Sequence, residues 1–271
     1  MLNTSRNWRV VGTSVTGTRH LREERECEDA FAYVSLSEHI FLLAVADGAG
    51  TASRSKEGAE CAVHAATSAV ASIIGAESSD EVFCRTVLER GLLAAREALE
   101  TLAGSAPGGE REAIDEAFPR QSLSAFATTL ILVLVTSTWL AALQVGDGAV
   151  VVQLVKGTVE TITKPDFKEY INECSFITDS DYQEHVQYAI RPLGEVCGIA
   201  LLTDGIQMIS LELATNTPYA PFFVPLFSFI AQAKLNESEL AAELYKFLAS
   251  PRVCEQTDDD KTLVLAVSLS N

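Results

Sequence analysis

Positive charge is scarce in this sequence, which has 20 Lys and Arg residues against 37 Asp and Glu residues and a formal net charge of −17. A surface this acidic repels phosphate backbones, so we expect neither nucleic acid nor an anionic membrane as a partner. Hydrophobic residues nevertheless make up 48% of the 271 positions. That share predicts a folded protein with a full core and not an acidic disordered segment.

Paired cysteines are also missing. The six cysteines stand at 27, 61, 84, 174, 197 and 254, and none of them forms a C-x-x-C pair, so neither a zinc knuckle nor a redox dithiol is indicated. The sequence begins MLNTSRNWRVVG, without the apolar core of an export signal. We therefore expect reduced thiols and a cytoplasmic location. The absence of a G-x-S-x-G motif argues against a serine hydrolase of the nucleophile-elbow type.

Charge is absent from the stretch 125–143, which reads AFATTLILVLVTSTWLAAL. Its length would suffice for a membrane helix. It is rich in Thr and Val, however, and Thr136-Ser137-Thr138 can turn the chain between two strands. We therefore predict a hairpin of two buried strands here, and no membrane span.

The periodicity predicts strands, then two helices, then strands, two more helices and a final strand. The expected strands are 8–16, 31–35, 39–46, 126–136, 138–145, 149–155, 158–163, 197–203 and the segment that closes the chain. The expected helices run from an N-cap at Ser53 to Gly75, then over 79–103, 219–233 and 237–249, the last opened by a capping box of Asn236 and Glu239. Strands that group together disfavour a parallel, doubly wound sheet. The order favours an α+β fold of two antiparallel sheets with helix pairs outside, in one domain over 1–271.

Two segments show no regular spacing of apolar residues. Residues 104–123 combine Gly, Pro and charge, which is typical of a surface loop. Residues 164–196 are mixed and polar, and we interpret them as a long functional loop, or flap, with some local structure. We expect this flap to be more mobile than the strands and to influence the choice of substrate.

Acidic residues recur at the ends of the predicted strands. Asp29, Asp47, Asp204 and Asp259 each lie at such a boundary. Taken alone, an Asp-Gly after a strand is an ordinary turn signal. Taken together, strand ends on one rim of a sandwich can converge, and buried carboxylates are costly without a cation. Oxygen ligands without nearby His or Cys favour Mg²⁺ or Mn²⁺.

Six short motifs in a fixed order carry a resemblance. They are CEDAF at 27–31, AVADGAG at 44–50, FATTLILV at 126–133, VGDGAV at 145–150, LLTDGI at 201–206 and DDKTLVLAV at 259–267. In this order they resemble the motifs of the metal-dependent, type 2C serine/threonine protein phosphatases, with a weaker likeness in the flap to a prokaryotic-type branch. The resemblance implies a four-layer α-β-β-α sandwich with metal ions at one end.

The resemblance also implies a set of metal ligands. Asp47 would bridge two ions, and Gly48 would offer its carbonyl oxygen to one of them. Asp204 and Asp259 would hold the other ion. The expected cofactor is therefore two ions of Mn²⁺ or Mg²⁺.

Two acids of the CEDAF motif have roles near these ions by the same resemblance. Glu28 would bind a water on the second ion, and Asp29 would accept a proton or orient a metal-bound water. Asp147 would serve a third ion together with Asp204. The family's Gly-Asp-Ser-Arg element has lost its Ser and Arg here, where Gly148 and Ala149 stand, so the third ion is the weakest of these expectations.

The phosphate-binding Arg of the family is another departure. Its position, five residues before the Asp of the first motif, is Glu24 in this sequence. A carboxylate there would repel a phosphate, so the role is expected to pass to Arg25, with Arg22 and His20 as alternatives. Arg25 comes first because it is one position away and a guanidinium can grip two phosphate oxygens.

The expected activity is hydrolysis of phosphoserine and phosphothreonine in proteins by a hydroxide that bridges two metal ions. Its partners would be a phosphorylated protein substrate and a serine/threonine kinase that supplies it, and the enzyme is expected to be a monomer. Two alternatives stay open: a regulatory pseudophosphatase that binds a partner without turnover, and a phosphatase of small molecules. Hydrolysis of para-nitrophenyl phosphate with and without Mn²⁺ distinguishes the first alternative from an enzyme.

Overall fold

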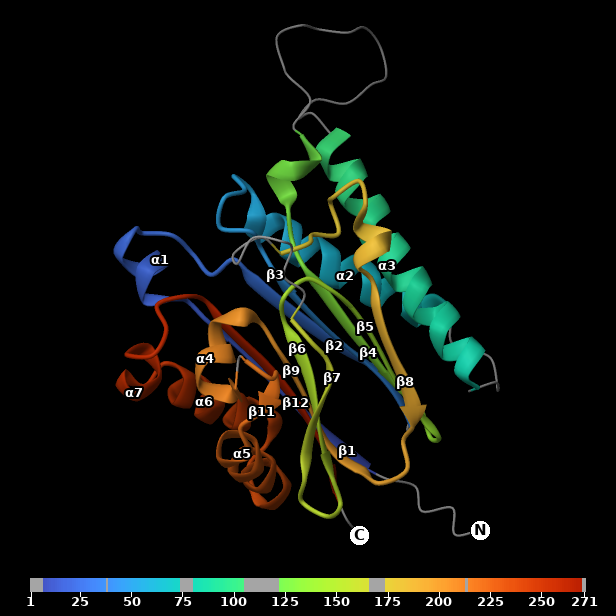
Figure 1. Cartoon of the computed structure of the whole chain (residues 1–271), viewed down its shortest axis with the longest axis vertical. Coiled ribbons are helices and arrows are strands. Elements are labelled where there is room, and N and C mark those ends of the chain that lie inside the picture. Colours follow the sequence, from blue (N-terminus) through green and yellow to red (C-terminus); the bar gives the residue numbers. More distant parts are fainter. Residues whose placement is uncertain are drawn as a thin grey trace, which may run out of the picture.

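The computed structural model describes residues 7–37, 39–73, 80–104, 122–165, 174–212 and 214–269. Two five-stranded antiparallel sheets lie face to face at its centre (Figure 1). One sheet has the order β1-β12-β9-β6-β7, with β1 at Asn7–Val15, β12 at Lys261–Leu269, β9 at Val196–Leu202, β6 at Ala149–Leu154 and β7 at Val159–Thr163. The other has the order β2-β3-β4-β5-β8, with β2 at Asp29–Ser37, β3 at Ile40–Asp47, β4 at Leu130–Val135, β5 at Trp139–Val145 and β8 at Gln187–Pro192.

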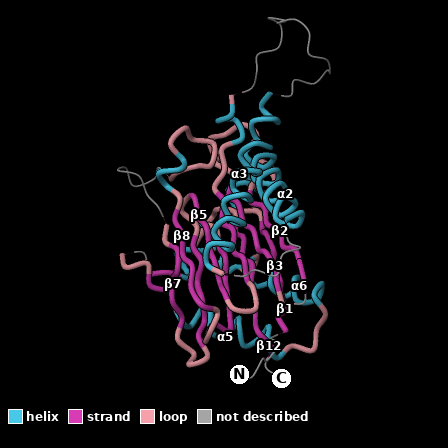
Figure 2. Tube along the Cα trace, turned by 90° about the vertical axis from the view of Figure 1, so that its right-hand side faces the viewer, coloured by secondary structure: helices cyan, strands magenta, loops and turns pink. Residues whose placement is uncertain are grey.

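Helix pairs cover the outer faces of both sheets, and Figure 2 shows the strands as a central block with helices outside it. Helices α2 (Ser55–Ile73) and α3 (Glu81–Gly104) pack on the β2-β3-β4-β5-β8 sheet. Helices α5 (Ala220–Gln232) and α6 (Glu237–Leu248) pack on the other. Short elements complete the description: α1 (Thr18–Arg22), α4 (Gln207–Ser210), α7 (Pro251–Cys254), β10 (Leu211–Glu212) and β11 (Thr217–Pro218). The predicted α+β sandwich of four layers is confirmed.

Three apolar layers hold the sandwich together. One lies between α2-α3 and their sheet, a second between the two sheets, and a third between α5-α6 and the other sheet. Strand β4 is buried along its whole length, Leu130 to Val135, because it lies inside a sheet that is covered on both faces. This explains why its sequence is continuously apolar and not alternating. The predicted hairpin over 125–143 is confirmed as β4 and β5, and within the described residues no helix is long and apolar enough to cross a membrane.

The structure corrects several predicted boundaries. Helix α2 begins at Ser55, so Ser53 lies in the preceding turn and is not its cap, whereas the capping box of Asn236 and Glu239 is confirmed. Strand β4 begins later than predicted, because residues 123–126 form a 3-10 turn. Gly75 and most of the loop 104–123 lie outside the described residues.

The flap predicted over 164–196 is in part regular structure. Its residues 187–192 form β8, which pairs with β5 at the edge of the sheet. All six side chains of β8 are only partly buried or exposed, and this mixed polarity conceals the strand from a search for apolar periodicity. Residues 166–173 lie outside the described residues, and control of substrate choice by the flap stays a prediction.

Candidate metal centre

The first two acids of the site face each other across one strand pair. Asp29 opens β2, Asp47 ends β3, and the antiparallel register places them directly opposite. Main-chain bonds hold Asp47: its N–H donates to Thr129 Oγ1 at 2.9 Å, and its carbonyl oxygen accepts from Thr128 Oγ1 at 2.9 Å. These bonds do not use the carboxylate of Asp47. The carboxylate therefore stays available at the end of the sandwich where β2 begins and β3 ends, which we call the rim.

The third acid, Asp204, comes from the opposite sheet. It lies two residues after the end of β9, where its carboxyl group interacts with that of Asp47. Thr203, the residue before it, donates from Oγ1 to Asp29 Oδ2 at 2.8 Å. The two sheets thus meet at this rim through polar contacts between Asp29, Thr203, Asp204 and Asp47.

Burial and mutual repulsion perturb these acids strongly. The pKa of Asp47 is raised well above its usual range, mainly by burial and then by repulsion from Asp29 and Asp204. The pKa of Asp29 is raised in the same way, mainly by burial and then by repulsion from Asp260. Burial and the neighbouring Asp204 raise the pKa of Asp147 to about 7. Burial also raises the pKa of Asp204, although its interaction with Asp47 and the charge of Arg19 oppose the rise. Acids gathered in this way need a compensating cation to stay ionised at neutral pH.

The residues present fit divalent cations. Asp29 Oδ1 and Glu28 Oε2 are buried oxygens for which the described residues supply no hydrogen-bond donor. Among those residues, no three His, Cys, Asp or Glu side chains are grouped so that all could ligate one ion. Each ion would therefore take one or two carboxylates and complete its coordination with water and backbone oxygen, which is how proteins commonly hold Mg²⁺.

Gly48 leaves room for the predicted backbone ligand. A Cβ on Gly48 would lie 2.7 Å from the carbonyl oxygens of Glu28 and Ser55, so any side chain would push the chain away from the rim. Its N–H donates to the Glu28 carbonyl oxygen at 3.2 Å, which fixes the peptide beside Asp47. The Asp-Gly pair of this motif is thus required by packing as well as by its turn.

The adjacent acids Asp259 and Asp260 have different surroundings. Asp260 is buried and accepts from the N–H groups of Gly17 and Glu28, each at 2.6 Å, and its Oδ2 also lies 3.0 Å from His20 Nδ1. Asp259 is partly exposed and pairs with Arg19 at 3.0 Å. Repulsion from Asp259 raises the pKa values of Asp147 and Asp204, and repulsion from Asp260 raises that of Asp29, in each case after burial. The two acids differ in that only Asp260 is buried and held by main-chain N–H groups.

The three predicted phosphate-binding residues differ in their exposure and in their access to the rim. His20 is 2% exposed and faces Asp260 and Glu28, so it has no open path to a substrate phosphate. Arg22 is largely exposed and lies 3.7 Å from Asp258. Arg25 reaches the rim, where its Nη2 donates to Glu28 Oε1 at 2.5 Å and lies 3.4 Å from the Gly50 carbonyl oxygen.

Sequence reasoning missed Arg19. Its guanidinium pairs with Asp259, and its Nη2 would lie 3.8 Å from a Cβ on Gly50, so Arg19 and Arg25 approach the same loop. Glu24 between them has a positive φ of 56°, the turn conformation that lets the chain reverse after α1. The short helix α1 brings Arg19 to the rim, and neither apolar periodicity nor a motif signals a helix of this length.

Asp147 keeps its predicted place beside Asp204, but the residues after it differ from the family motif for a packing reason. A Cβ on Gly148 would lie 2.6 Å from the carbonyl oxygen of Leu202 and 2.6 Å from Ile131 Cδ1. A Ser at this position would therefore collide with β9. The Gln207 side chain donates to the Asp147 carbonyl oxygen, which ties this loop to the start of α4.

Gly205 should be intolerant of any side chain. A Cβ there would lie 1.8 Å from the Asp260 carbonyl oxygen, a backbone atom that cannot move without displacing Asp259. We expect Gly205→Ala to lower the free energy of unfolding by about 1–3 kcal/mol, the usual cost of overpacking. Urea unfolding measures this, with Gly104→Ala as the control because no atom of the described residues lies within 4 Å of a Cβ on Gly104. Equal stability of Gly205→Ala and the parent would contradict the close approach.

Comparisons with known proteins agree with this rim. The family model "Protein phosphatase 2C" matches residues 16–249. The chain is 34% identical over 267 residues to serine/threonine-protein phosphatase 3 of Escherichia coli (strain K12), covering 96% of this chain and 98% of that protein. The chain belongs to the protein phosphatase 2C family, whose members are metal-dependent serine/threonine phosphatases.

Solved structures share the fold at low identity. A bacterial serine phosphatase superposes with a TM-score of 0.65 at 14% identity, covering 97% of this chain and 98% of that one. The catalytic domain of the serine/threonine phosphatase PstP, in complex with two manganese ions, has a TM-score of 0.62 at 14% identity, covering 97% and 99%.

Proposed function

We propose that this chain removes phosphate from phosphoserine and phosphothreonine side chains of proteins, with Mn²⁺ or Mg²⁺ held at the rim by Asp47, Asp204 and Asp259. The observation that supports this most is the cluster of buried and half-buried aspartates with raised pKa values at Asp29, Asp47, Asp147 and Asp204. Such a cluster lowers the stability of the fold, and bound cations would compensate its charge.

The bound ions would supply two things, a water of lowered pKa and compensation for the charge of the phosphoryl group. Asp29 would orient that water. Thr203 donates to its Oδ2, and its buried Oδ1 has no hydrogen-bond partner among the described residues, which supports this role. Glu28 Oε2 is likewise free, and Asp147 with Asp204 would serve a further ion. His20 and Asp260 would act by holding the Glu28 main chain in position.

Arg19 and Arg25 would receive the substrate phosphate. Both guanidiniums lie beside Gly50 and pair with carboxylates of the rim, Asp259 and Glu28. The acids of the rim repel a dianionic phosphate. The two guanidiniums would attract it and so offset this repulsion.

Removing Arg25 should weaken substrate use without weakening metal binding. Loss of one charge-assisted contact costs roughly 1.5–3 kcal/mol, so we expect Arg25→Ala to lower kcat/KM by about ten- to a hundredfold. Arg19→Ala should act in the same direction. Arg22→Ala is the control, because Arg22 faces solvent. Steady-state kinetics on a phosphopeptide, beside calorimetric Mn²⁺ titration, measures both quantities. Unchanged kinetics in Arg19→Ala and Arg25→Ala would mean that the metals alone bind the phosphate.

A covalent cysteine mechanism has little support. Cys84 and Arg90 have the C-x5-R spacing of cysteine-dependent phosphatases, but both lie within helix α3, so no phosphate-binding loop forms. Cys84 is buried, and this burial raises the pKa of its thiol to about 11. A thiol in that state is a poor nucleophile at neutral pH.

The test of the proposed function compares substrates. Metal-stripped protein is assayed with Mn²⁺ on a phosphothreonine peptide and on para-nitrophenyl phosphate. We expect Mn²⁺-dependent release from both, with the higher kcat/KM on the peptide. Release from the small ester alone would favour a small-molecule phosphatase. No release from either would favour a pseudophosphatase. Pairing with a serine/threonine kinase, a monomeric state and a cytoplasmic location complete the proposal.

A further inference from the structure

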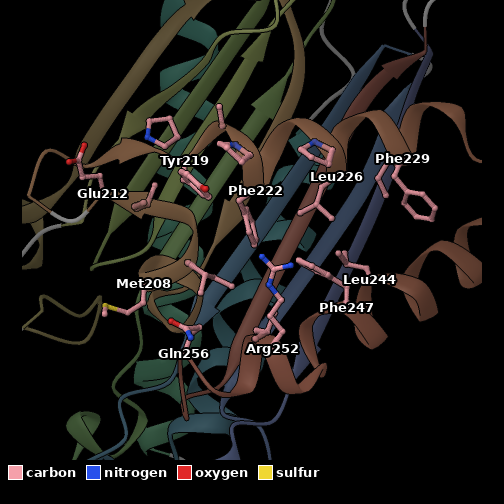
Figure 3. A pocket seen from close by; sticks show the side chains of 18 of the residues that line it. Met208, Glu212, Tyr219, Phe222, Leu226, Phe229, Leu244, Phe247, Arg252 and Gln256 are labelled. Atoms are coloured by element: carbon pink, nitrogen blue, oxygen red, sulfur yellow. The ribbon is translucent and has the colours of Figure 1, made fainter.

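An apolar groove lies on the outer face of the α5-α6 layer. It has a volume of about 1100 Å³ and is walled by α4, β10, β11, α5, α6 and α7 (Figure 3). Its rim exposes large apolar side chains, with Met208 64%, Tyr219 57%, Phe229 42% and Phe247 37% exposed. Exposed apolar side chains that gather around one groove mark a candidate interaction site.

Helix α5 is apolar on two sides. Phe223, Phe227 and Ile230 are buried against the β1-β12-β9-β6-β7 sheet, while Leu226 and Phe229 line the groove. A helix that is apolar all round is normally covered all round. The described part of the chain thus leaves one side of α5 uncovered. Aromatic, Met and Arg side chains surround this side, and these residue types are enriched at protein interfaces.

The charge in the groove indicates what would cover it. Two acids line it: Glu243 pairs with Lys246 at 2.7 Å, and Glu212 accepts from Thr215 Oγ1 at 3.1 Å. Arg252 is the basic residue of the wall, and among the described residues no hydrogen bond or ion pair engages its guanidinium. Figure 3 shows the Arg252 side chain at the groove together with Phe222 and Phe247. An exposed guanidinium beside apolar side chains suits an anionic group flanked by apolar ones.

We propose that this groove docks a segment of a protein partner that carries apolar side chains around one carboxylate, with the carboxylate on Arg252. A second copy of the chain is disfavoured, because each copy has a net charge of −17. A single fatty acid fits less well, since a groove of about 1100 Å³ is larger than the usual small-ligand pocket and open along its side. An amphipathic peptide segment can cover such a groove by apolar anchors at helical spacing.

The groove adjoins the candidate metal centre along the chain. Its wall includes Met208, four residues after Asp204, and Gln256, three residues before Asp259. Binding itself is independent of turnover, so it can be measured whether or not the proposed activity is correct.

The test uses a phage-displayed library of random 16-residue peptides, selected on the full chain. Selected peptides are synthesised with a fluorophore, and their affinity is measured by fluorescence polarisation. The variants are Phe229→Ser and Arg252→Gln, which alter the groove, and the controls are Val82→Ser and Arg90→Gln on α3, in the opposite helical layer. Thermal melting confirms that each variant is folded.

We expect selected peptides to combine apolar residues with an Asp or Glu. Their affinity should fall by at least about tenfold in Phe229→Ser and in Arg252→Gln and stay unchanged in both controls. Changing the peptide's acid to its amide should weaken binding to the parent but not to Arg252→Gln. No enriched peptides, or peptides that bind the groove variants as well as the parent, would overturn the proposal. So would dodecanoate that binds in an Arg252-dependent way when no peptide does.

Discussion

Replacing Asp47 with Asn should abolish metal-dependent phosphatase activity and leave the fold intact. Asp47 lies opposite Asp29 in register, and repulsion from Asp29, Asp204 and Asp147 contributes to its raised pKa, which places it at the centre of the cluster. Asparagine has nearly the same shape but no charge, so it would no longer bridge two cations. The bonds that hold this residue to Thr128 and Thr129 use its main chain, and these survive the substitution.

Two measurements check the effect of Asp47→Asn. Phosphopeptide turnover in saturating Mn²⁺ should fall to background, and calorimetry should show that binding of Mn²⁺ is weakened or lost. Asp258→Asn is the matched control, because Asp258 is exposed and neighbours the cluster without belonging to it. An Asp47→Asn protein with parental turnover would remove Asp47 from the mechanism.

Metal ions should also stabilise the folded chain. The cluster keeps several acids at raised pKa values by burial and repulsion, so the metal-free fold bears a cost that bound cations relieve. At a free concentration of one hundred times Kd, a single ion contributes about 2.7 kcal/mol. For a chain of this size we expect Mn²⁺ to raise Tm by about 5–10 °C.

Thermal melting with EDTA and with Mn²⁺ tests this stabilisation. The shift should persist in Asp258→Asn and disappear in Asp47→Asn, whose metal-free form should melt no lower than that of the parent because one buried charge is gone. An equal shift in Asp47→Asn would place the stabilising ion elsewhere in the molecule.

The sequence predicted the layers and the main acids because both depend on strong patterns. Strands such as 39–46 end on an acid and a glycine, and two helical periods follow them. The grouping of strands and helices is enough to define a sandwich. Strand β8 escaped prediction because its half-buried residues at a sheet edge show no clear alternation.

The details of the rim depended on tertiary contacts. No local pattern distinguishes Asp259 from Asp260, and only their distant partners, Arg19 for one and Gly17 with His20 for the other, separate their roles. The same holds for His20, whose burial against Asp260 comes from elements far apart in the chain. Arg19 was missed because α1 is too short to show a helical period.

The central claim is that the acids at this rim bind metal ions, and a crystal structure with Mn²⁺ tests it most directly. Anomalous difference density should show ions between Asp47, Asp204 and Asp259, with Asp47 contacting two of them and the Gly48 carbonyl oxygen contacting one. Crystals grown in saturating Mn²⁺ that show no anomalous peak within coordination distance of Asp47 would contradict the account.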